Sequence, residues 1–239
     1  MSAVDLEAPV TAGELQTVVA ARRLAGKSSV FIGVGRPSTA AILARMVHNP
    51  DLVLVYESGT IGAKPHRVPL SIGDGELAET ADAVVSVPEM FNYWIGPGRI
   101  QVAFLGAAQV DRHANLNSTV IGDYERPRTR LPGAGGAPEI ATGVQEVVVI
   151  VPHSPRTFVP ALDFKTTSGG RTTAVVTDLG VLEPPRPGDE LELVAVHPGV
   201  EVDRVREATG WDLRVAGEVA VTEAPTREEL GALRELVAR

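Results

Sequence analysis

The residue with the clearest capacity for chemistry in this chain is Glu57. It follows residues 52–56, a run of five apolar residues that predicts a buried strand ending in a turn. A carboxylate therefore lies where a strand meets its loop, and ligands of open α/β sheets bind at the carboxyl ends of strands. A carboxylate in that position can equally cap the turn or point into solvent. Position alone therefore does not decide between a catalytic and a structural role for Glu57.

A second candidate feature is a stretch nearly free of side chains, Gly-Ala-Gly-Gly-Ala at residues 133–137. Pro138 follows it, and because proline is tolerated in the first turn of a helix, the pattern predicts a turn that opens onto a helix. The backbone N–H groups of such a turn can bind an anion. A plain turn at the start of a helix would have the same sequence.

The sequence gives little support to metal-dependent catalysis or to a serine nucleophile. The five histidines are scattered, none has the spacing of a metal-binding motif, and the chain has no cysteine, so we expect no metal site. There is no G-x-S-x-G motif. Ser58 is directly beside Glu57, and side chains of adjacent residues diverge, which argues against Ser58 as a nucleophile.

A dinucleotide site is the main competing interpretation. Gly33-x-Gly35-x-x-Ser38 follows a predicted strand and precedes a predicted helix, and Glu57 ends the next strand. Ser38 stands where that motif requires its third glycine, and the interpretation gives the glycine turn no role. It predicts NAD(H) binding that Gly35→Val abolishes.

Charge and composition limit the partners. Thirty acidic against 22 basic residues give a net charge of -8, and only 4% of residues are aromatic, which argues against nucleic acid as a partner. Arg126, Arg128 and Arg130 alternate on a predicted loop and could bind phosphates or a dicarboxylate by bidentate contacts. Such a triplet is also typical of a solvated edge or a subunit contact.

The length of 239 residues and the 44% hydrophobic content allow a sizeable core, and we expect a single domain over residues 1–239. No run reaches the roughly 18 apolar residues of a membrane helix, and the N-terminal segment with Asp5 and Glu7 lacks the plan of a signal peptide. We therefore expect a cytoplasmic protein with no membrane partner.

The expected elements describe an open, mostly parallel α/β sheet flanked by helices, with a β-rich second half. Thr11-x-x-Glu14 and Thr226-x-x-Glu229 are capping boxes that each start a helix, and Ser38 is expected to cap a third. Shorter helices are expected over residues 88–94, from 138 and over 201–208. Apolar runs predict strands at 28–34, 52–56, 83–87, 100–105, 146–151, 156–162, 173–177 and 191–196.

Six short motifs occur in order between about residues 15 and 210. They are Glu57-Ser58-Gly59, Gly106-Ala107-Ala108-Gln109-Val110-Asp111, Asn115-Leu116-Asn117-Ser118, Gly133-x-Gly135-Gly136, Thr177-Asp178-Leu179-Gly180-Val181 and His197-Pro198-Gly199-Val200. The ordered series resembles the β subunit of family I coenzyme A transferases, and most closely the glutaconate CoA-transferase type. The resemblance implies the fold of that subunit and an enzyme that transfers CoA between carboxylic acids.

The resemblance also implies a mechanism. The Glu57 carboxylate would attack an acyl-CoA thioester, and a ping-pong exchange would pass through a glutamyl-CoA thioester on Glu57. The residue type suits the role, because a glutamate is ionised at neutral pH and needs no general base. The CoA thioester would be a substrate, and no permanently bound cofactor is expected.

Further site residues follow from the same resemblance. Gly135 or Gly136 would donate a backbone N–H to the tetrahedral oxyanion. Ser58, Gly59, Gln109 and Asn115 would line the substrate site. Arg126 and Arg128 are assigned to substrate or CoA binding by their residue type and spacing rather than by the resemblance. Amides such as Gln109 and Asn115 that only satisfy loop backbone would look the same in the sequence.

The resemblance implies a companion α subunit and therefore a hetero-oligomer. Some relatives lack the glutamate motif and hydrolyse ring-containing CoA thioesters, whereas Glu57-Ser58-Gly59 is intact here and favours transfer. Branches that act on 3-oxoacids have Glu-Asn-Gly instead, so the acceptor acid stays open. Hydrolysis, nucleotide binding and a non-enzymatic regulatory role are the alternatives.

Overall fold

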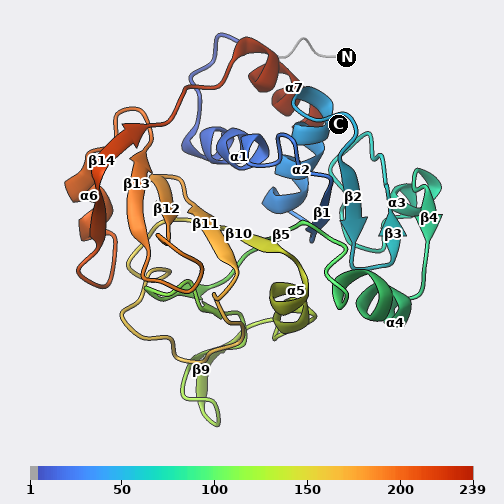
Figure 1. Cartoon of the computed structure of the whole chain (residues 1–239). Helices are drawn as coiled ribbons and strands as arrows, with labels where there is room; N and C mark the ends of the chain where they lie inside the picture. Colours follow the sequence, from blue (N-terminus) through green and yellow to red (C-terminus); the bar gives the residue numbers. More distant parts are fainter. Residues whose placement is uncertain (1–4, 239) are drawn as a thin grey trace.

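A ten-stranded open sheet runs through the computed structural model, which describes residues 5–238 (Figure 1). The strands at its centre are parallel to their neighbours, and antiparallel pairs lie toward both edges. In spatial order they are β14 (Arg214–Val221), β13 (Glu192–Val196), β12 (Gly180–Glu183), β11 (Thr172–Val176), β10 (Glu146–Ile150), β5 (Val102–Leu105), β1 (Ser29–Ile32), β2 (Val53–Tyr56), β3 (Thr60–Ile61) and β4 (Ala83–Val84). The expected fold class is confirmed.

Helices cover both faces of this sheet. On one face lie α1 (Ala12–Arg22), α2 (Arg36–Val47) and α7 (Arg227–Val237), and on the other lies α5 (Ala137–Gly143) (Figure 1). The α5 face also holds two hairpins, β6 (Gln109–Val110) with β7 (Leu116–Asn117) and β8 (Val120–Gly122) with β9 (Pro127–Arg130). The remaining helices are α3 (Gly75–Glu79), α4 (Val87–Glu89), the π-helical η1 (Met90–Ile95) and α6 (Val202–Glu207).

The central strands are buried on both sides, which explains their continuous apolar sequences. Side chains alternate along a strand, so Val30 and Ile32 pack into the core beneath α1 and α2 while Phe31 packs into the core on the α5 face. All three are at most 2% exposed. Within residues 5–238, no helix is long and apolar enough to cross a membrane.

Both expected capping boxes are formed. The Thr11 hydroxyl accepts the Glu14 N–H at 3.2 Å, and the Glu14 carboxylate accepts the Thr11 N–H at 2.8 Å. Thr226 and Glu229 repeat this pattern at 3.2 and 2.7 Å. These reciprocal bonds satisfy backbone donors that a helix start would otherwise leave open.

The expectation that Ser38 caps a helix is wrong. Gly35 is the N-cap of α2 and provides no side-chain hydrogen bond. Ser38 lies within α2, is fully buried, and its hydroxyl is 2.9 Å from the Tyr56 hydroxyl. The serine satisfies a buried tyrosine on β2, which sequence spacing could not reveal.

The strand expected at residues 156–162 is also wrong. The Thr157 N–H donates to the Ser154 carbonyl at 2.9 Å in a turn, and only Phe158 forms an isolated bridge, with Val110. Prolines at 155 and 160 have no N–H and so cannot donate to a strand ladder. The expected strand at 83–87 is shortened to β4, because Ser86 caps the helical turn that follows.

Candidate active site

Glu57 lies in the tight turn that joins β2 to β3. The Gly59 N–H donates to the Tyr56 carbonyl at 3.0 Å, so Glu57 and Ser58 occupy the two central positions of the turn. Gly59 has a φ of +100°, and a Cβ there would lie 1.9 Å from the carbonyl oxygen of Val85. Glycine is therefore required at this position by both backbone conformation and space. The turn places Glu57 at the carboxyl end of β2.

The glycine turn before α5 lies against the Glu57 carboxylate. A Cβ built on Gly136 would be 2.8 Å from Oε1 of Glu57 and 2.5 Å from Cζ of Phe91. A side chain at this position would push the Glu57 carboxylate or the Phe91 ring aside. The structure thus brings together two residues that are 79 positions apart in the sequence. Phe91 lies in the π-helical η1, and no motif in the sequence points to it as a site residue.

A cavity of about 310 Å³ opens beside Glu57. Of the described residues that line it, Glu57 alone carries an ionisable side chain, and the others are apolar or glycine. They come from the carboxyl ends of β1, β2, β5 and β10, from the glycine turn and from the first turns of α2 and α5: Phe31, Gly33, Val34, Pro37, Glu57, Phe104, Leu105, Gly106, Ala134, Gly135, Gly136, Ala137, Ile140 and Ile150. The carboxylate therefore opens onto a cavity whose other side chains are apolar.

Three backbone donors of the glycine turn are free. The Gly133 N–H donates to Ser118 and the Ala137 N–H to Ala134, whereas the N–H groups of Ala134, Gly135 and Gly136 have no acceptor within residues 5–238. Gly135 adopts a φ of +52°, in the left-handed region that glycine occupies readily. Because Ala134, Gly135 and Gly136 all line the cavity, their N–H groups are available to a ligand there.

The Ser58 hydroxyl is buried and lacks a hydrogen-bond partner among the described residues. Ser58 does not line the Glu57 cavity. A role for Ser58 in substrate binding stays a prediction. Gly59 likewise lies outside the cavity and acts on Glu57 through the turn.

The two predicted amides are bound within the protein. Nε2 of Gln109 donates to Asp163 at 2.9 Å and its Oε1 accepts from Asn117 at 2.7 Å. Nδ2 of Asn115 donates to Asp111 at 2.9 Å. Neither residue lines the cavity beside Glu57, so the structure does not bring them to the carboxylate. Both amides instead tie together the loops in which they lie.

Arg126 and Arg128 belong to the β8–β9 hairpin and are exposed. Arg128 lines a second cavity, of about 760 Å³, together with Arg156. Arg126 does not line either cavity. Arg130 lies 5.1 Å from the centre of the Tyr124 ring and donates to the Tyr124 carbonyl at 3.1 Å. Arg156 falls within the wrongly expected strand at 156–162, so the sequence does not single it out as a binding residue.

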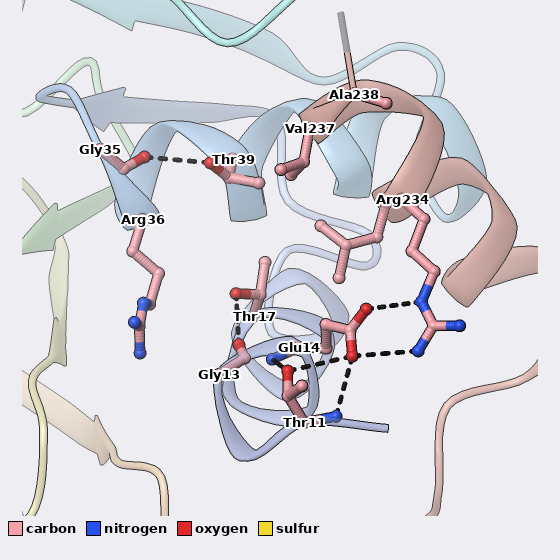
Figure 2. Close-up of a pocket in the computed structure, with 11 residues that line it drawn as sticks. Thr11, Gly13, Glu14, Thr17, Gly35, Arg36, Thr39, Arg234, Val237 and Ala238 are labelled. Carbon is pink, nitrogen blue, oxygen red and sulfur yellow. Dashed lines mark hydrogen bonds and ion pairs between the residues drawn. The ribbon is translucent and has the colours of Figure 1, made fainter. Parts of the chain in front are cut away.

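A further cavity, of about 580 Å³, lies between α1, the start of α2 and α7 (Figure 2). Its carboxylate, Glu14, faces Arg234 at 2.6 Å and also accepts the Thr11 N–H, as Figure 2 shows. The Arg234 guanidinium and these bonds lower the pKa of Glu14 to about 2. Glu14 is thus engaged in an ion pair with Arg234 that holds α7 against α1.

Two histidines, His153 and His197, are buried. His153 has its ring nitrogens 3.2 Å from the Thr177 hydroxyl and 2.9 Å from the Thr209 hydroxyl, and burial lowers its pKa to about 4. Burial also lowers the pKa of His197, whose Nε2 lies 2.8 Å from the Thr177 carbonyl. Residues 5–238 contain no cluster of three or more histidines and carboxylates that could hold a metal ion.

Comparison with known proteins identifies the family. Residues 14–208 match the sequence profile of the coenzyme A transferase family. The chain is 54% identical to the B-type subunit of 3-oxoadipate CoA-transferase from Pseudomonas knackmussii, with 95% of this chain and 93% of the relative covered. It is 32% identical to the B-type subunit of glutaconate CoA-transferase from Acidaminococcus fermentans, with 93% and 90% covered. The 3-oxoadipate relative is thus much more similar than the glutaconate type that the motifs suggested.

Solved structures agree with this result. The crystal structure of glutaconate coenzyme A-transferase from Acidaminococcus fermentans superposes with a TM-score of 0.89, at 30% identity, over 95% of each chain. The decarboxylase AibA/AibB superposes with a TM-score of 0.87, at 29% identity, over 96% of each chain, so the same fold also supports another reaction. The sequence profile, the similarity to two B-type subunits and the shared fold show that the chain belongs to the coenzyme A transferase family, as a CoA-transferase subunit of the B type.

Proposed function

We propose that Glu57 is the nucleophile of an enzyme that moves CoA from an acyl-CoA to a carboxylic acid. The observation that carries this proposal is the contact between the Glu57 carboxylate and Gly136, in a cavity where Glu57 is the ionisable lining residue. A carboxylate held by a tight turn in an apolar space is a suitable nucleophile, since it requires no base to remove a proton. It also has less competition from water there than at an open surface.

The exchange balances without water or a redox partner. A Glu57 oxygen attacks the thioester carbonyl carbon, the C–S bond breaks, and an acyl-glutamyl anhydride forms with release of CoA thiolate. The thiolate attacks the glutamyl carbonyl, which gives a glutamyl-CoA thioester and releases the first acid. The acceptor carboxylate then attacks the glutamyl carbonyl carbon and the glutamyl C–S bond breaks, which gives a new acyl-glutamyl anhydride and free CoA thiolate. The thiolate attacks the acceptor's acyl carbon in this anhydride. Acyl-CoA leaves, and Glu57 returns to a carboxylate.

Each tetrahedral intermediate carries an oxyanion that needs donors. The free N–H groups of Gly135 and Gly136 lie in the cavity and next to Glu57, where they can donate to that oxygen. One such preorganised donor contributes about 3 kcal/mol to lowering the barrier. This proposal assigns Gly135 and Gly136 to transition-state stabilisation.

We assign a short dicarboxylic 3-oxoacid, 3-oxoadipate, as the acid acceptor. The support is the 54% identity to a relative named for that acid. Glu57-Ser58-Gly59 is compatible with this assignment, since the nucleophile and the turn glycine are both present.

A companion A-type subunit completes the enzyme in this proposal. The support is that both relatives are named as one subunit of a larger enzyme. The cavity beside Glu57 measures about 310 Å³, at the lower end of the range of about 300–1,000 Å³ for small-molecule sites. A CoA thioester is larger than such a site holds, so most of the substrate must bind elsewhere on this chain or on the companion.

The test is an exchange assay on the complex with the companion subunit, from succinyl-CoA to 3-oxoadipate. Glu57→Gln keeps the shape of the side chain but removes its charge, and we expect loss of transfer with intact folding and complex formation. Release of free CoA with water as the sole acceptor would instead identify a hydrolase. Transfer at the wild-type rate by the Gln variant would contradict the proposal.

A further inference from the structure

The second cavity, of about 760 Å³, lies on the α5 face of the sheet beside the β8–β9 hairpin, which projects at the bottom of Figure 1. Three segments form its walls: the chain after β5, the hairpin, and the loop after β10. The lining residues are Ala108, Gln109, Ile121, Arg128, Thr129, Pro155, Arg156, Val159, Pro160, Ala161 and Asp163. Its volume is that of a site for a nucleotide-sized ligand.

The charges of this cavity favour an anion. Arg128 and Arg156 come from different walls, and neither guanidinium has a hydrogen-bond or ion-pair partner within residues 5–238. Asp163 contributes the third charge, but its Oδ2 already accepts from Gln109 at 2.9 Å and from the Gly122 N–H at 3.0 Å. The lining therefore has a net charge of +1 in a chain whose net charge is -8.

Both arginines project from backbone that is already fixed. Arg156 lies in a turn in which the N–H groups of Thr157 and Phe158 donate to the Ser154 carbonyl at 2.9 and 2.8 Å. Arg128 lies on β9, which pairs with β8. The Asp163 bonds to Gln109 and Gly122 fasten the three walls to one another. Binding an anion here would therefore order only the two side chains.

The two cavities have lining residues close to each other at the end of β5. Gly106 lines the Glu57 cavity and Ala108 lines the arginine cavity. Two residues of extended chain span at most about 7 Å, so these parts of the two walls lie near each other. The chain after β10 repeats this arrangement, with Ile150 on the first cavity and Pro155 on the second. A long ligand could react at Glu57 and place an anionic end between the arginines.

We propose that Arg128 and Arg156 bind the phosphate groups of the CoA nucleotide, an inference that rests on the proposed function of Glu57. CoA has its diphosphate and 3′-phosphate at the opposite end from the sulfur, joined by a long flexible arm. Guanidinium groups bind phosphate oxygens through paired, charge-assisted hydrogen bonds. The carboxylates of a short acid reacting at Glu57 would instead stay within the smaller cavity.

The test compares the wild-type complex with Arg128→Ala/Arg156→Ala. Because the two substitutions remove charge-assisted hydrogen bonds, we expect the KM for acyl-CoA to rise about tenfold or more. The kcat at saturation and the KM for the acid should stay unchanged. Arg186→Ala is the matched control, because Arg186 is also exposed and lines neither cavity. It should leave both KM values unchanged.

A second arm measures binding without turnover. The Kd of CoA and of 3′-dephospho-CoA is measured by calorimetry on the complex with the companion subunit that carries Glu57→Gln. We expect the wild-type arginines to favour CoA over dephospho-CoA, and the double alanine variant to lose that preference. The Kd values do not depend on whether Glu57 is the nucleophile. The test can therefore contradict the proposal for the arginines without contradicting the proposal for Glu57, and the reverse also holds.

Three outcomes would overturn the assignment. An increase in the KM for the acid alone would place the acid carboxylate between the arginines. Weaker association with the companion, with unchanged KM values, would make the arginines a subunit contact. Equal Kd values for CoA in the wild-type and double-variant backgrounds would show that the nucleotide binds elsewhere.

Discussion

Replacing Gly136 by alanine should inactivate the enzyme while leaving it folded. The added Cβ would lie 2.8 Å from Oε1 of Glu57 and 2.5 Å from Cζ of Phe91, both well inside normal contact distance. Gly136 has φ -89° and ψ 2°, which alanine also adopts, so the effect is steric rather than a backbone strain. Overpacking of this size costs about 1–3 kcal/mol of stability, and displacing a catalytic group by about 1 Å lowers the rate about 100-fold.

The assay is kcat for CoA transfer by the complex with the companion subunit, beside a thermal melt of each variant. Gly217→Ala is the matched control, because a Cβ at Gly217 meets no atom within 4 Å, and it should keep wild-type kcat. A folded Gly136→Ala enzyme with wild-type kcat would refute the reasoning.

Two predictions concern stability. Gly59→Ala should lower the free energy of unfolding by about 3 kcal/mol or more, as measured by urea denaturation. The reason is that the added Cβ would lie 1.9 Å from the Val85 carbonyl oxygen and that φ at this position is +100°. A loss below about 1 kcal/mol would contradict the described turn. The pKa of His153, lowered to about 4 by burial, means that the unfolded chain binds a proton near pH 6.5 while the folded protein does not. Stability should therefore fall by up to about 3 kcal/mol between pH 6.5 and 4. His153→Gln should flatten that slope, and an unchanged slope would exclude His153 as its source.

The centre of the fold is more predictable from the sequence than its edges. Strands such as Ser29–Ile32 and Val53–Tyr56 are buried on both faces, and their continuous apolar runs are diagnostic. The edge strand β14 escapes prediction because most of its residues are exposed, so burial imposes no apolar pattern on it. The short β12 escapes prediction as well. The apolar residues around Phe158 resemble a strand, but the prolines on either side prevent one.

The candidate site is predictable in part. Glu57 and the glycine turn both stand out in the sequence, and the structure places Gly136 against the Glu57 carboxylate. Gln109 stands out through a motif, but its partner Asp163 is 54 residues away and could not be inferred from spacing. The contribution of Phe91 and the pairing of Arg156 with Arg128 depend on tertiary packing, which leaves no local signal.

The central claim is that Glu57 carries CoA covalently during turnover. The most direct measurement incubates the complex of this chain and its companion with acyl-CoA in the absence of acceptor, quenches it, and analyses its peptides by mass spectrometry. The mechanism predicts a CoA thioester on the peptide that contains Glu57, which disappears when 3-oxoadipate is added and is absent from Glu57→Gln. An active complex whose Glu57 peptide stays unmodified, or whose adduct lies on another residue, would contradict the account.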